Sequence, residues 1–331
     1  MHKKKIFGAT VVSASIALIF IAAMVMPDES DFITHIVKRG ETVSLLCIEI
    51  YGHFSNELGV AFTKDNPDVK NINLIYVGQN LKFRKPVSEE TLPTEQEKEV
   101  ESVFQKKVNA TQGVVTYVEG QANLTKKDST KSEKLLANVV VYPGDMIKTG
   151  SDGRVELIIN RESVVRMKEN SELTIEAYRD LAKDNGKTSL NFSLGSVWTK
   201  MKQFKDNVSR FELELPTAIA GVHGTVYQST VNSDHSAEVK VYDGEVAVSG
   251  KQPQKPTTLQ PLHEVPGPQQ VPGPHEVTME QWTTIVRAMQ SIRIDSQGKP
   301  TNAVSFQKNP NDSWEKWNEE RDKRIAEMFA E

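Results

Sequence analysis

The chain has 331 residues, enough for two or three domains, and its 40 Lys and Arg residues nearly balance its 44 Asp and Glu residues, for a formal net charge of −4. That balance gives no basic surface of the kind that nucleic acid binds, so we expect no nucleic-acid partner. Cys47 is the single cysteine, which excludes an internal disulfide framework and a zinc site built on four cysteines.

The first thirty residues have the composition of an export segment. Lys3, Lys4 and Lys5 precede residues 6–26, a run of 21 residues without a charge. Because about 20 helical residues span a bilayer core, this run predicts a signal peptide or a retained signal anchor over residues 1–30. The lysines would stay in the cytoplasm, so we expect the rest of the chain in the periplasm, anchored in the inner membrane or released if the leader is cleaved.

Residues 34–83 have the pattern of a strand, two helices and a second strand. Thr42 is a favourable N-cap, and apolar residues follow it at helical spacing. Gly52 can end this first helix in a left-handed conformation, and Ser55 can cap a second helix that Asn66-Pro67 stops. A short alternating strand closes the segment, so the predicted order is β-α-α-β.

This segment resembles the lysin motif (LysM), a small βααβ module, which we place at residues 34–86. The resemblance is carried by VKRGETV at 37–43, NPD at 66–68, NINLIYVGQNL at 71–81, and the Tyr51-Gly52 pair. It implies binding of glycans that contain N-acetylglucosamine, in bacteria peptidoglycan. The implied glycan-binding residues lie in the loop after the first strand and the loop before the second: Gly40, Glu41, Thr42, Val43, Asp68, Asn71, Asn73, Leu74, Ile75 and Tyr76.

The chemistry of such a groove follows from main-chain groups. An N-acetyl group has an amide donor and an amide acceptor. Exposed N–H and C=O groups at a helix start and a strand start can pair with both. Ile75 and Tyr76 would add an apolar floor and a hydroxyl group.

The central part of the chain changes to a period of two. Residues 87–112 are rich in Glu and Lys and are expected to be a solvated linker. Residues 113–250 then alternate apolar and polar side chains in short runs, with turn residues such as Pro143-Gly144-Asp145 and Asp243-Gly244 between them. This pattern predicts an all-β domain, as a sandwich, a barrel or a solenoid.

The same stretch resembles the FecR domain. The resemblance is carried by residues 113–115, 143–150, 195–200, 211–225 and 241–246, in that order. The family relays signals across the periplasm to a sigma factor through a cytoplasmic segment. Because only residues 1–5 precede the apolar run, we expect a scaffold for another envelope protein more than a relay of that kind.

The C-terminal part is expected to be a linker followed by helices. Residues 251–275 contain VPGP twice, which favours an extended spacer. The tail, 276–331, is predicted to be helical in two parts. Helical spacing of apolar residues indicates the first part: Trp282, Ile285, Val286 and Met289. Asp312 and Glu315 are placed as a capping pair for the second.

Nothing in these segments indicates an enzyme. The sequence lacks paired carboxylates at useful spacing, an activated nucleophile and metal-binding spacing, so we expect no catalytic residue, cofactor or metal. The predicted fold class is a multidomain α+β protein with an apolar signal or anchor helix, a βααβ module, an all-β domain and a helical tail. Two functions stay open: a peptidoglycan-binding protein whose β domain is a scaffold, and a FecR-like periplasmic signal-transduction component.

Overall fold

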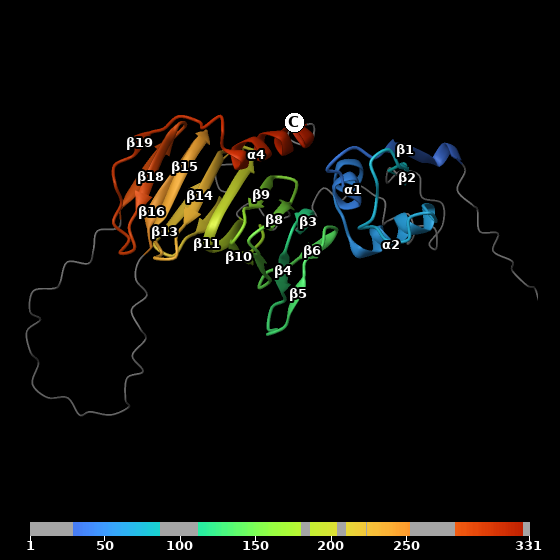
Figure 1. Cartoon of the computed structure of the whole chain (residues 1–331), viewed down its shortest axis with the longest axis horizontal. Coiled ribbons are helices and arrows are strands. Elements are labelled where there is room, and N and C mark those ends of the chain that lie inside the picture. Colours follow the sequence, from blue (N-terminus) through green and yellow to red (C-terminus); the bar gives the residue numbers. More distant parts are fainter. Residues whose placement is uncertain are drawn as a thin grey trace, which may run out of the picture.

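The computed structural model of the protein describes most of the chain: residues 29–86, 112–179, 186–203, 210–222, 224–251 and 282–326. The predicted signal or anchor run at 6–26 lies outside these ranges, as do nearly all residues of the two predicted linkers. In the described ranges, no helix is long and apolar enough to cross a membrane. Figure 1 shows a small N-terminal module beside a large β domain, with the C-terminal helix lying against the β domain near that module.

The N-terminal module follows a short 3-10 turn at Glu29–Asp31. Its elements are β1 (Phe32–Ile36), α1 (Val43–Tyr51), α2 (Asn56–Asp65) and β2 (Asn80–Arg84), with β1 and β2 paired antiparallel. Thr42 Oγ1 accepts a hydrogen bond from the Leu45 N–H, and Gly52 ends α1 at a φ of 80°, as the sequence predicts. Ser55 caps α2 in the same way. The order of elements agrees with the prediction, although order alone identifies no family.

The β domain is a sandwich of two sheets. The first, here named the covered sheet, has the order β6 (Val139–Val141), β3 (Gly113–Glu119), β8 (Arg154–Ile159), β9 (Ser163–Met167), β11 (Lys187–Met201), β14 (Val226–Val231), β15 (Ala237–Asp243), β18 (Gln290–Ile294) and β19 (Val304–Ser305). The second, here named the open sheet, has the order β5 (Ser132–Lys134), β4 (Ala122–Thr125), β7 (Met146–Thr149), β10 (Glu172–Ala177), β11, β12 (Arg210–Glu214), β13 (Ala218–Val222), β16 (Glu245–Gly250) and β17 (Thr283–Arg287). The expected all-β domain is therefore present as a sandwich.

Strand β11 belongs to both sheets. Its first half pairs with β10 and β12 in the open sheet, and its second half, from Gly195 on, pairs with β9 and β14 in the covered sheet. Gly195 has a φ of +94°, and a Cβ atom there would lie 2.2 Å from Ser171 Oγ. A glycine is required at this point because the strand changes direction in a conformation, and in a space, that other residues do not tolerate.

Apolar residues are buried on both faces of the covered sheet. Val115, Leu157 and Val165 point into the sandwich core, with residues such as Phe192 and Leu213 of the open sheet. Their neighbours alternate to the opposite face because side chains in a strand have a period of two. These outward residues, Val114, Val140, Ile158 and Val164, pack with the apolar residues of the N-terminal module. The covered sheet therefore lies between two hydrophobic cores.

The C-terminal tail corrects one prediction and confirms another. Residues 282–289 were expected to be helical, but β17 and β18 lie there, one in each sheet, and Met289 adopts a φ of 59° in the turn that connects them. The second helix is present as α4 (Ser313–Arg324), with the Asp312 carboxylate accepting from the N–H groups of Trp314 and Glu315. Trp314 packs with Trp198 and Tyr242 on the outer side of the covered sheet. In the described part of the tail, strands therefore come first and a helix follows.

Candidate functional site at the junction of the two domains

The structure brings the two predicted glycan-binding loops together at a surface that faces the β domain. Residues from both loops, Glu41 and Thr42 from the first and Asn73 and Ile75 from the second, line a cavity of about 250 Å³. The β domain forms the opposite wall: Val118, Gly120, Lys134, Leu135, Leu136, Ala137 and Asn138. The cavity is therefore a feature of the junction and not of the N-terminal module alone.

The other predicted residues lie around this cavity without lining it. Val43 is fully buried at the start of α1, and the carbonyl oxygen of Gly40 accepts a hydrogen bond from α4. Leu74 and Tyr76 are 58% and 68% exposed. Asp68 and Asn71 are exposed as well, and the Asn71 side chain accepts from the Asn73 N–H within its own loop. The predicted set is thus divided between the cavity, the junction and open surface.

Asn138 of the β domain connects the two loops. Its side-chain oxygen accepts from the Ser44 N–H at 2.7 Å, in the first turn of α1. Its side-chain nitrogen donates to the Ile72 carbonyl oxygen at 3.1 Å and to Asn73 Oδ1 at 2.9 Å. Nearby, the Thr42 hydroxyl group donates to the Thr116 carbonyl oxygen at 2.7 Å. Polar groups at the start of α1 are therefore satisfied by the β domain.

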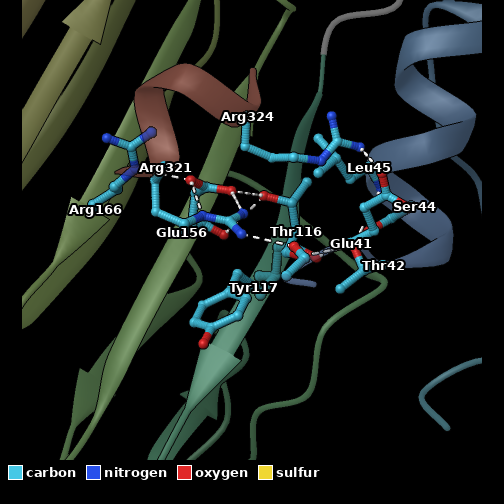
Figure 2. A network of polar contacts seen from close by, with 12 residues as sticks. Glu41, Thr42, Ser44, Leu45, Thr116, Tyr117, Glu156, Arg166, Arg321 and Arg324 are labelled. Carbon is cyan, nitrogen blue, oxygen red and sulfur yellow. Dashed lines mark hydrogen bonds and ion pairs between the residues drawn. The ribbon is translucent and has the colours of Figure 1, made fainter. Parts of the chain in front are cut away.

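A buried ion network joins α4 to both domains (Figure 2). Glu156 on β8 and Arg166 on β9 are fully buried, and Arg166 Nε donates to Glu156 Oε2 at 2.8 Å. Arg321 of α4 donates to the same carboxylate and, through Nη1, to the Gly40 carbonyl oxygen at 2.7 Å. Burial by itself raises the pKa of Glu156, but the positive charges of Arg321 and Arg166 overcome it and lower that pKa to about 2. Glu156 is therefore ionised at neutral pH.

A second guanidinium of α4 reaches the N-terminal module. Arg324 Nη2 lies 2.6 Å from Glu41 Oε1, and its Nη1 lies 3.0 Å from Glu49 Oε1. Glu41 Oε2 also accepts from the Lys38 N–H and lies 2.7 Å from His35 Nε2. Burial raises the pKa of Glu41, but these hydrogen bonds and Arg324 lower it overall. Glu41 thus acts here as a buried anion held by α4.

Sequence reasoning missed the residues that build the junction: Thr116, Asn138, Glu156, Arg166, Arg321 and Arg324. One signal was present, because Glu156 and Arg166 each interrupt an otherwise apolar strand, and a charge in such a strand must be paired when buried. The role of Asn138 had no signal in its own neighbourhood. Cys47 is buried and its pKa is raised by burial, which agrees with an unreactive thiol. In the described part of the chain, no group of three or more His, Cys, Asp or Glu residues could hold a metal.

Comparison with known proteins identifies the middle of the β domain. Residues 145–247 match the family model described as FecR protein. This FecR region includes Glu156, Arg166 and the shared strand β11, and it confirms the expected FecR domain over a shorter range than 113–250. Thr116, Asn138 and α4 lie outside the FecR region. The junction is therefore built partly from family structure and partly from segments on either side of it.

The searches of curated proteins and of solved structures do not extend this family match to other parts of the chain. A search of curated proteins found no match. Two crystal structures of a candidate anti-sigma factor from Parabacteroides distasonis ATCC 8503 align at 12% identity, with a TM-score of 0.34, over 49% of this chain. The aligned part spans 60% of that protein's length, so the alignment does not extend over the whole of either chain. None of these matches supports the lysin-motif resemblance of residues 34–83.

Proposed function

We propose that this protein is a non-catalytic signal-transduction component of the cell envelope, which acts by binding another protein through its FecR region. The observation that carries the proposal is the family match at residues 145–247, since the FecR resemblance implies signal relay through protein contacts. The charge-free run at 6–26 supports a periplasmic location with an inner-membrane anchor. The partner would be a receptor or a regulator of transcription in the same envelope pathway.

The open sheet offers the better partner surface. The outer side of the covered sheet is already occupied by the N-terminal module and by α4. The outer side of the open sheet instead has accessible charged side chains in cross-strand ion pairs, such as Lys148 with Glu172 and Lys187 with Glu212. A surface with mixed charges suits a partner that is recognised by complementary charge and released again.

Two measurements test this function. Loss of the protein should change the transcription of a defined set of genes, and a Lys148→Glu, Lys187→Glu double variant should reproduce that change while the protein stays folded. Lys308→Glu is the matched control, because Lys308 is also exposed and ion-paired but lies in the segment before α4. A transcriptome that is identical with and without the protein would overturn the proposal.

Glycan binding is a second candidate function, favoured by one observation. The two loops that the lysin-motif resemblance selects meet at one cavity, where Thr42, Asn73 and Ile75 share a wall. A single shallow groove would bind in the micromolar to millimolar range, about −8 to −4 kcal/mol. Sedimentation with purified murein tests it: Asn73→Ala and Tyr76→Ala should each reduce the bound fraction, and unchanged retention of both variants would remove this candidate.

A further inference from the structure

The side-chain amide of Asn138 has the position that a bound ligand would have. It is 6% exposed and enters the N-terminal module from the loop before β6. Its oxygen accepts from the main chain of one predicted ligand-binding loop, at Ser44, and its nitrogen donates to the main chain of the other, at Ile72. One planar amide thus bridges both loops.

This bonding pattern has a specific chemistry. The Ser44 N–H is one of the first N–H groups of α1, which have no partner within the helix. An amide supplies both the acceptor that this N–H needs and the donor that the Ile72 carbonyl oxygen needs. An acetamido group on a sugar has the same pair of atoms. Such a group can reach these positions only if Asn138 leaves them.

The surroundings of Asn138 have room for the rest of a ligand. The adjoining cavity of about 250 Å³ is lined by Thr42 and Asn73 on the polar side and by Ile75, Leu135 and Leu136 on the apolar side. A pyranose ring presents hydroxyl groups at its edges and an apolar face, so it fits a cavity with polar and apolar walls. The ion pairs of Arg321 and Arg324 then hold the two domains in the arrangement that keeps Asn138 in place.

We propose that Asn138 is an internal stand-in for an amide-bearing ligand, and that it occupies the site between residues 40–44 and 72–75 until an acetamido group displaces it. This inference rests on the second candidate function and specifies how its site is regulated. The apparent dissociation constant of a ligand rises in proportion as the fraction of molecules with an open site falls. Removal of the Asn138 side chain should therefore increase affinity, whereas removal of an ordinary ligand-binding residue would decrease it.

The test uses the full chain with chitotetraose as the probe. Asn138 has a φ of 63°, which glycine adopts readily, so Asn138→Gly removes the amide without backbone strain. Asn170→Gly is the matched control, because Asn170 has a φ of 56° in an exposed turn of the sandwich between β9 and β10. We expect calorimetry to show that Asn138→Gly binds chitotetraose about tenfold more tightly than the wild type, if roughly one molecule in ten is open before the change. Asn170→Gly should leave the affinity unchanged.

Hydrogen exchange of the Ser44 amide gives a second measurement at the site itself. That amide should exchange faster in Asn138→Gly and should be protected again by chitotetraose. The fully deacetylated glucosamine tetramer should give no protection, because it has no amide. Should chitotetraose bind all three proteins equally, the second candidate function would survive and this inference would be overturned; binding to none of them would remove both.

Asn138→Asp keeps the experiment decisive if the glycine variant does not fold. The carboxylate retains an acceptor for the Ser44 N–H at a helix N-terminus but cannot donate to Ile72 or Asn73. An oxygen would then face the Ile72 carbonyl oxygen and Asn73 Oδ1 in place of the donor, so the side chain should hold the closed site less well and the affinity for chitotetraose should exceed that of the wild type. An affinity of Asn138→Asp equal to or below that of the wild type would show that the side-chain amide does not block the site, which would overturn the proposal.

Discussion

Arg321 in the C-terminal helix donates a hydrogen bond to the carbonyl oxygen of Gly40, a residue 281 positions earlier in the chain. The same guanidinium pairs with the buried carboxylate of Glu156 in the sandwich. One side chain therefore contacts the N-terminal module and the β domain while it is fixed to α4. Because Glu156 depends on it for charge compensation, loss of this residue should have consequences beyond the loss of one contact.

Arg321→Ala should lower the free energy of unfolding by about 3 to 5 kcal/mol, because it leaves a fully buried carboxylate with a single guanidinium partner. Urea denaturation at pH 7 measures the change. Arg293→Ala is the control, since the Arg293 side chain is 76% exposed and pairs with Glu238 at the surface. Its loss should cost at most about 1 kcal/mol. Equal effects of the two substitutions would contradict the assigned role of Arg321.

Acid should weaken the junction through Glu156. Its pKa is lowered in the folded protein to about 2 from an ordinary value of 4.5, so the stability it contributes is present above about pH 4.5 and is lost as the pH falls toward 2. The loss is on the order of 3 kcal/mol. Glu156→Gln cannot titrate, so its unfolding free energy should fall less than that of the wild type between about pH 5 and pH 2. Parallel curves for the two proteins would show that Glu156 is not ionised in the folded state.

Thr42→Ala should loosen the docking of the N-terminal module as well as the start of α1. Thr42 caps α1 and also donates to the Thr116 carbonyl oxygen of the β domain, whereas Ser55 caps α2 by accepting from the Leu58 N–H within the N-terminal module. Each alanine substitution should cost about 0.5 to 2 kcal/mol in stability through its cap. Only Thr42→Ala should also speed exchange of the Ser44 amide, as measured by NMR. Faster exchange in Ser55→Ala to the same degree would mean that capping alone controls this amide.

Gly195→Ala should destabilise the sandwich at the point where β11 passes between the sheets. The added Cβ atom would lie 2.2 Å from Ser171 Oγ, and the φ of +94° is unfavourable for alanine. The expected loss is about 1 to 3 kcal/mol from backbone strain, with a further contribution from the clash. Gly221→Ala is the comparison, because its nearest non-neighbouring atom would be 3.7 Å away. Thermal unfolding should show a large decrease in melting temperature for the first variant and little change for the second.

Local elements were predictable where one residue type has one physical role. Thr42, Gly52 and Ser55 stand at the helix ends at which their side chains or backbone are expected. The alternation of apolar and polar residues in the central region indicated the sandwich strands, because side chains in a strand point alternately to the two faces of the sheet. The FecR resemblance was correct, and the comparison confirms it for residues 145–247.

The two consecutive strands β17 and β18 show where periodicity fails. Trp282, Ile285, Val286 and Met289 have helical spacing, but a short apolar run fits either structure. Neighbouring strands decided the outcome, since Val286 is buried opposite Val246 of β16. Met289 has a positive φ in the turn between these strands, which is unusual for methionine, so the sequence did not predict a turn there.

The junction could not be predicted because its residues are far apart in the chain. Arg324 and Glu41 form an ion pair, but no spacing rule connects their positions. The lysin-motif resemblance selected loops that do meet in space, and it could not show that Asn138 of another domain enters between them. Local patterns specify the elements, whereas the packing of one domain on another depends on shape and charge across the whole surface.

The passage of β11 through both sheets has a mechanical consequence. A strand of 15 residues whose two halves are hydrogen-bonded to different partners cannot be pulled from one layer without disturbing the register of the other. Force applied at either end of the sandwich is therefore shared between the layers. Force that a bound partner applies to the open sheet would therefore be transmitted along the backbone of β11 to the covered sheet, which contacts the N-terminal module.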